Sequence, residues 1–123
     1  MSGAAESEFI ALARRFLADA SLDVDILDQP ATDDPSYISF WLRSSTKALT
    51  GVLIPRESPG SPQRVTLGDQ VQEFIHEELA VLGRPAVWPE CPAHPGSHPL
   101  IAVLSDGDAV WACPRTHEAL LMI

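Results

Sequence analysis

The chain has 123 residues, 46% of them apolar, which is enough to bury a core, and we expect a single compact domain. Its 17 acidic and 8 basic side chains give a net charge of -9, which disfavours nucleic acid and anionic membranes as partners because both require clustered Lys and Arg. No signal peptide starts the chain and no apolar stretch approaches ~18 residues, so we expect a soluble, cytoplasmic protein.

The first predicted element is a helix over residues 6–20, in which apolar side chains recur at helical spacing on one face. Residues 21–28 alternate apolar with acidic side chains, which is typical of a half-buried strand. After a turn rich in Pro and Asp, residues 36–43 carry the strongest strand signal, because they are rich in aromatic and β-branched side chains. A short hairpin connection leads to a third strand over residues 48–54.

A second helix is predicted after a polar loop over residues 55–63. Thr66 would be its N-cap, with Asp69 at the third helical position, and Gly83 would end it. Residues 1–84 therefore predict an α+β body of order α-β-β-β-α, an antiparallel three-stranded sheet with both helices on one face.

Residues 85–123 form a proline-rich tail that we expect to dock on this body. Six of the eleven prolines lie in the tail, and fixed φ angles favour a wrapping chain over long elements. Two apolar runs flank residues 106–107, an Asp-Gly pair that predicts a zinc-ribbon-like β-hairpin with a two-residue turn. This register places Leu100 opposite Cys113, and residues 119–123 would add a strand or a short turn of helix.

Both cysteines and three of the four histidines lie in the tail. Cys91 and His94 are separated by two residues, so one turn can present both to a single ion. The hairpin register puts His98 on the same face as Cys113, which would complete a set of four ligands. His117 is the alternative fourth ligand, and both alternatives stay open because sequence fixes a hairpin register only loosely. A Cys2His2 set predicts Zn²⁺, since thiolate and imidazole suit that ion.

Two other interpretations of these side chains remain. Two buried free thiols beside surface histidines would need no metal ion at all. A disulfide between Cys91 and Cys113 is the other, and it is disfavoured in the reducing compartment that we expect for this chain.

Three short motifs in the chain form a pattern. They are Trp88-Pro-x-Cys91-Pro-x-His94, His98-Pro-Leu100 and Trp111-x-Cys113-Pro. The pattern resembles the C-terminal signature of a group of small uncharacterised actinobacterial proteins. The likeness covers about residues 70–114 and implies a similar fold and a shared metal site, but no catalytic residues.

The favoured function is a non-enzymatic interaction or regulatory module with a structural zinc ion and a protein partner, because four protein ligands leave no position for a reactive water. An alternative is a small zinc-dependent hydrolase, in which three of these side chains bind the ion, water takes the open position and Glu90 acts as the base. A second alternative is a metal-free peptide-binding module that uses a free strand edge.

Overall fold

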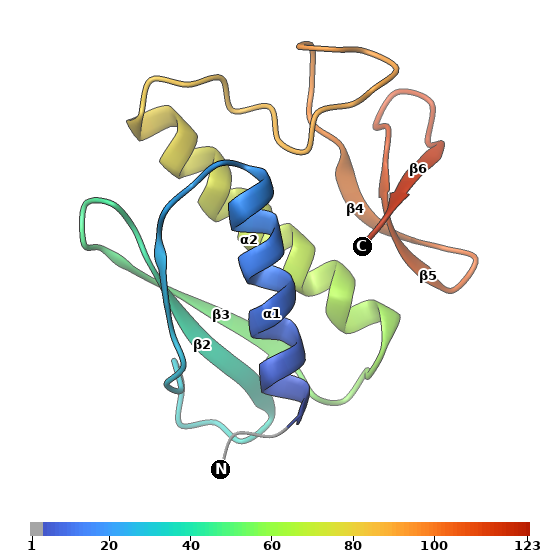
Figure 1. Cartoon of the computed structure of the whole chain (residues 1–123). Helices are drawn as coiled ribbons and strands as arrows, with labels where there is room; N and C mark the ends of the chain where they lie inside the picture. The colour runs from blue at the N-terminus through green and yellow to red at the C-terminus, as the bar shows by residue number, and fades with distance from the viewer. Residues whose placement is uncertain (1–3) are drawn as a thin grey trace.

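The computed structural model describes residues 4–123 (Figure 1). Its elements are α1 (Ala4–Asp19), β1 (Asp25–Leu27), β2 (Tyr37–Arg43), β3 (Leu49–Pro55), α2 (Ser61–Val81), β4 (Ile101–Ser105), β5 (Asp108–Ala112) and β6 (Ala119–Met122). The order confirms the predicted α+β class, with an α-β-β-β-α body. Neither helix in this part of the chain combines the length and the apolar character that crossing a membrane requires.

Two antiparallel sheets pack against α2. The first has the strand order β1-β2-β3 and the second β4-β5-β6. Figure 1 shows α2 running between the two sheets, and it contacts β3 of the first as well as β4 and β5 of the second. α1 packs on both α2 and β2. The second sheet thus covers a side of α2 that the first sheet leaves free, and the tail becomes part of the same core.

The side of α2 that meets the second sheet includes a small and a polar residue. Gly68 allows a close approach, since a Cβ at that position would lie 3.3 Å from the ring of Trp111. Gln72 is buried, and its Nε2 donates to the carbonyls of Trp88 at 3.1 Å and Leu100 at 2.6 Å. A count of apolar positions does not detect these two contacts, because a glycine and a glutamine make them.

The predicted start of the second helix is wrong. α2 begins at Ser61, well before the expected N-cap Thr66, and takes up part of the expected loop. Gly60 precedes the helix with a φ of 90°, and its N–H donates to Gln63 Oε1 at 3.3 Å. Pro62 fits the first turn because the missing N–H has no helical acceptor there. Thr66 lies inside the helix, where its hydroxyl donates to the Pro62 carbonyl at 3.1 Å.

The first strand is shorter than predicted. Of residues 21–28, only Asp25–Leu27 form a strand, which pairs with β2. Ser21 has a φ of 57°, and the N–H of Leu22 still donates to the Leu17 carbonyl at 2.9 Å. The first residues of the predicted strand therefore serve to end α1 before the chain becomes extended.

The β4–β5 hairpin has the predicted register, with Leu104 opposite Ala109. Its turn residues Asp106 and Gly107 have φ values of 52° and 85°, the two positive angles of a type I′ turn. The end of the chain, for which strand and helix were both open, is strand β6 and pairs with β5. The expected hairpin is therefore two strands of a three-stranded sheet.

Two tryptophans of the tail pack against α1. The rings of Phe16, Trp88 and Trp111 contact one another pairwise, with centroids 5.6–5.8 Å apart. Trp88 Nε1 also donates to Asp19 Oδ2 at 3.0 Å, and its carbonyl lies 2.8 Å from His76 Nε2. Contacts to both helices therefore hold the segment that leads into the Cys/His residues.

Candidate metal centre

Four side chains of the tail converge on one point. They are Cys91, His94, His98 and Cys113, here called the Cys/His cluster, and each offers one ligand atom within 4.8 Å of the others. Within residues 4–123, no other group of three or more His, Cys, Asp or Glu side chains brings its ligand atoms this close together. The cluster could hold a metal ion.

The separations between ligand atoms define the shape of the cluster. His94 Nδ1 lies 3.5 Å from Cys91 Sγ and 3.6 Å from Cys113 Sγ. His98 Nε2 lies 3.1 Å from His94 Nδ1 and 3.9 Å from Cys113 Sγ. The four atoms therefore surround a small space, with all six separations within 4.8 Å.

The chain brings Cys91, His94 and His98 together through local backbone contacts. A tight turn starts at Cys91, whose carbonyl accepts the N–H of His94 at 3.1 Å. Residues 89–91 then run antiparallel to residues 98–100, and the N–H of Cys91 donates to the His98 carbonyl at 3.4 Å. This pairing, which sequence reasoning did not include, places His98 beside Cys91.

Cys113 follows directly on β5 and starts a second turn. Its N–H donates to the Glu118 carbonyl at 3.0 Å, and its carbonyl accepts the N–H of His117 at 2.8 Å. The sharp turn that the alternative fourth ligand requires is thus present. The side chain of His117 is nevertheless exposed and is not one of the four clustered residues.

The ring of His98 is oriented by a neighbouring carbonyl. His98 Nδ1 lies 3.0 Å from the Pro99 carbonyl oxygen, and a carbonyl can only accept a hydrogen bond. The proton of the neutral ring is therefore on Nδ1, and the lone pair of Nε2 faces the other ligand atoms. Histidine ligands in proteins are commonly held by such a contact on the second ring nitrogen.

The environment of Cys113 favours the thiolate. Burial raises the pKa of this thiol, but hydrogen bonds from the main chain and hydroxyl of Thr116, from the Arg115 main chain and from Cys91 outweigh it. The resulting pKa is about 6, below the ordinary 9.0. Thiolate is the form that binds metals. Sequence reasoning missed Arg115 and Thr116, although donors just after a Cys-Pro turn are a usable signal.

The two thiols are both buried and both free, so the predicted alternative of a disulfide between Cys91 and Cys113 is wrong for this structure. His94 and His98 are half-buried. The two imidazoles of the cluster are therefore partly exposed at the surface, whereas its two sulfur atoms are buried.

Glu90, the candidate base of the hydrolase alternative, lies next to Cys91 in the chain. Its side chain is exposed, and Oε2 accepts the N–H of Gly96 at 2.7 Å. This contact closes the loop that carries His94. The carboxylate thus has a positioning contact in the loop over residues 88–100.

The strand edge that the peptide-binding alternative requires is partly covered at β3. Gln70 of α2 pairs with the backbone of Leu53, accepting its N–H at 3.0 Å and donating to its carbonyl at 2.7 Å. Gln63 Nε2 donates to the Pro55 carbonyl at 2.9 Å. These side chains occupy hydrogen-bonding groups that an added strand would use.

No protein-family model, curated protein or solved structure gives a significant match to the chain. The resemblance to the actinobacterial group stays a prediction.

Proposed function

We propose that Cys91, His94, His98 and Cys113 bind one zinc ion, and that the protein is a non-enzymatic interaction or regulatory module built around this structural centre. The observation that supports it is the spacing of the ligand atoms. A tetrahedral zinc ion with Zn–S of about 2.3 Å and Zn–N of about 2.0–2.1 Å has edges between ligand atoms of about 3.3–3.8 Å. Four of the six separations in the cluster are 3.1–3.9 Å, close to that range, and all six are within 4.8 Å.

The chemistry of the four side chains also favours zinc. Two thiolates and two imidazoles suit zinc, whereas magnesium and calcium prefer carboxylate and carbonyl oxygens. The low pKa of the Cys113 thiol, about 6, supports a thiolate ligand. The His98 tautomer set by the Pro99 carbonyl supplies a free lone pair on Nε2.

A structural role is favoured over catalysis by the number of ligands. Four protein ligands fill a tetrahedral sphere and leave no position for an activated water. Both cysteines are fully buried, and Cys91, Leu100 and Cys113 belong to the same core cluster as the apolar side chains of α2. An ion at this point would therefore tie two turns of the tail to the core.

Metal content tests the proposal most directly. We expect native mass spectrometry of the freshly purified protein to give one zinc ion per chain, and denaturation to release it and expose two free thiols. A native protein that binds no zinc, even when zinc is supplied after reduction, would contradict the proposal.

Two histidine variants test the choice of ligands. His98→Asn removes a proposed ligand, whereas His117→Asn changes an exposed side chain outside the cluster. Asparagine suits position 117, where φ is 64°, because it tolerates the left-handed region. We expect His98→Asn to weaken zinc binding by at least about 100-fold in competition with a chromophoric chelator, since a lost ligand exceeds the 10–100-fold typical of outer contacts.

We expect His117→Asn to bind zinc like the wild type. The reverse pattern would assign the fourth position to His117. Unchanged affinity in His98→Asn would favour three protein ligands and a water, the arrangement of the hydrolase alternative.

A further inference from the structure

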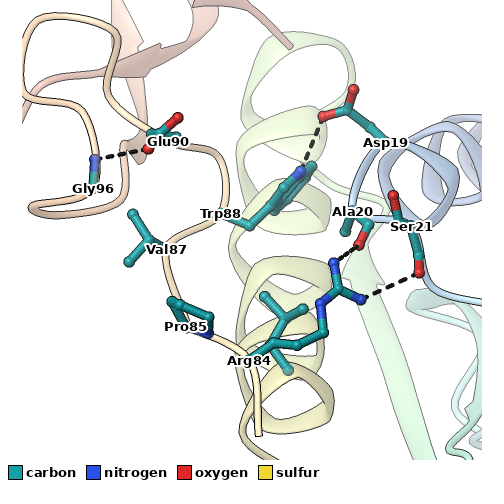
Figure 2. Close-up of a pocket in the computed structure, with 10 residues that line it drawn as sticks. Asp19, Ala20, Ser21, Arg84, Pro85, Val87, Trp88, Glu90 and Gly96 are labelled. Atoms are coloured by element: carbon teal, nitrogen blue, oxygen red, sulfur yellow. Dashed lines mark hydrogen bonds between the residues drawn. The ribbon is translucent and has the colours of Figure 1, made fainter. Parts of the chain in front are cut away.

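A separate pocket lies where both helices end and the loop over residues 88–100 begins (Figure 2). Its volume is about 360 Å³, which is within the usual range for sites that hold a small ligand or a protein side chain. The ligand atoms of the Cys/His cluster do not line it. It is therefore a distinct concave site.

Two carboxylates line this pocket, Asp19 from the end of α1 and Glu90 from the loop. Each has one oxygen in a hydrogen bond: Asp19 Oδ2 accepts from Trp88 Nε1 at 3.0 Å, and Glu90 Oε2 accepts from the Gly96 N–H at 2.7 Å (Figure 2). These contacts orient the side chains. The remaining oxygen of each carboxylate has no hydrogen-bond partner among residues 4–123 and can accept from a ligand.

Arg84 also lines the pocket, but its guanidinium group binds main-chain carbonyls rather than the two carboxylates. Arg84 donates to the carbonyls of Ala20 at 3.2 Å and Ser21 at 3.4 Å, at the end of α1 (Figure 2). It therefore offsets the partial negative charge of that helix end. Neither Asp19 nor Glu90 forms an ion pair within the described chain. The pocket thus keeps two carboxylates without a cationic partner.

The other walls are apolar. Leu79 and Trp88 are buried, and Val87 is half-buried beside them. A pocket with apolar walls and two partly free carboxylates matches a cation carried on an aliphatic chain, because the methylene groups and the charged end then find different partners. The chain's net charge of -9 also steers basic molecules towards it.

We propose that this pocket is the docking site for a lysine or arginine side chain of a basic protein partner. The inference rests on the proposed interaction function and names the chemistry of the partner. Glu90 precedes Cys91 and contacts Gly96, which lies between His94 and His98, so a bound metal ion would hold one wall of the pocket in place.

The test uses the zinc-loaded, ¹⁵N-labelled chain of 123 residues and the indole N–H signal of Trp88, which donates to Asp19 inside the pocket. The probe is a capped Gly-Gly-Lys-Gly-Gly peptide, compared with the same peptide carrying norleucine. We expect a saturable shift with the lysine peptide that weakens as salt is added, and at least about tenfold weaker binding of the norleucine peptide. Equal binding of both peptides, or no shift with either, would overturn the inference.

A double variant, Asp19→Asn with Glu90→Gln, removes both charges with little change of shape. The matched control, Asp33→Asn with Glu73→Gln, makes the same charge change at exposed sites outside the pocket. We expect the first to weaken binding of the lysine peptide at least tenfold and the second to stay within about twofold of wild type, since exposed and distant charges are screened. Equal loss in both would indicate general charge attraction and would contradict a built site.

Two further readouts separate the related explanations. Butylammonium carries the same cation without a peptide, and binding as tight as that of the lysine peptide would point to a free amine as ligand and overturn the protein-partner assignment. Zinc content is measured on the same samples. A wild type without zinc contradicts the structural zinc centre, whereas a zinc-loaded wild type without the Trp88 shift contradicts the pocket.

Discussion

Gln72 is a buried side chain that joins α2 to both ends of the loop over residues 88–100, which carries Cys91, His94 and His98. It donates to the carbonyls of Trp88 and Leu100. The Trp88 carbonyl keeps His76 as a partner when Gln72 is removed, but the Leu100 carbonyl would be left buried without this donor. We therefore expect Gln72→Met to lower the free energy of unfolding by about 1–3 kcal/mol, the cost of one unsatisfied buried polar group.

Urea denaturation measures this change. Glu73→Met on the same helix is the control, because its side chain is exposed and we expect a change within about 0.5 kcal/mol. Equal stabilities of the two variants would mean that the Gln72 contacts contribute nothing.

At the same scale, the sequence predicts the clustered residues better than the groups that support them. Cys91 and His94 share a short turn, and few residue types bind metals, so spacing alone selects them. The supporting groups are the Pro99 carbonyl, the Thr116 donors and the Gln72 amide. Their roles depend on where the backbone passes in space, which residue identity does not report.

Gly68 controls how closely α2 approaches the second sheet. Replacing glycine by alanine within a helix normally stabilises by about 1 kcal/mol. Here the added Cβ would lie 3.3 Å from the Trp111 ring, which is buried and in contact with Phe16 and Trp88, so the three packed rings would have to shift. Overpacking costs about 1–3 kcal/mol and should prevail.

We expect Gly68→Ala to lower the free energy of unfolding by about 1 kcal/mol. In a Trp111→Phe background, where the larger ring is absent, the same substitution should be neutral or stabilising. Urea denaturation of the four proteins of this double-mutant cycle measures the coupling. Stabilisation by Gly68→Ala in the wild type would show that the contact is not restrictive.

The elements with strong local signals were predicted correctly. β2 is rich in aromatic and β-branched residues, and the Asp106-Gly107 turn allows the positive φ angles of a tight hairpin. The ends of elements were predicted less well. The start of α2 depends on Gly60, on Pro62 and on the side chain of Gln63, which accepts the Gly60 N–H. Thr66 was therefore a plausible but wrong N-cap.

At the scale of the whole molecule, the core is continuous. One cluster of buried side chains includes Phe40 of the first sheet, Val71 of α2, and Leu100 and Trp111 of the tail. The sequence predicted a tail docked on a body, but not that α2 would lie between two sheets. Buried polar residues of α2, such as Gln72, do not appear in a pattern of apolar positions, so the pattern does not predict that a second sheet covers the helix.

A continuous core predicts cooperative unfolding, and the proposed zinc site predicts that this unfolding depends on zinc. Because α2 packs on both sheets, melting of the tail would uncover part of the core of the body. We therefore expect far-UV circular dichroism and tryptophan fluorescence to report one coincident thermal transition for the zinc-loaded protein. Free zinc at about 1,000 times its Kd adds about 4 kcal/mol, so removing it should lower Tm by at least about 10 °C.

The control for this experiment is Cys91→Ser. If it no longer binds zinc, its Tm should already be low and should not fall further with chelator, because no ion remains to be removed. Two separate transitions in the zinc-loaded wild type would indicate that the tail unfolds independently of the body. An unchanged Tm after complete removal of zinc would show that the packing between α2 and the second sheet holds the tail without the ion.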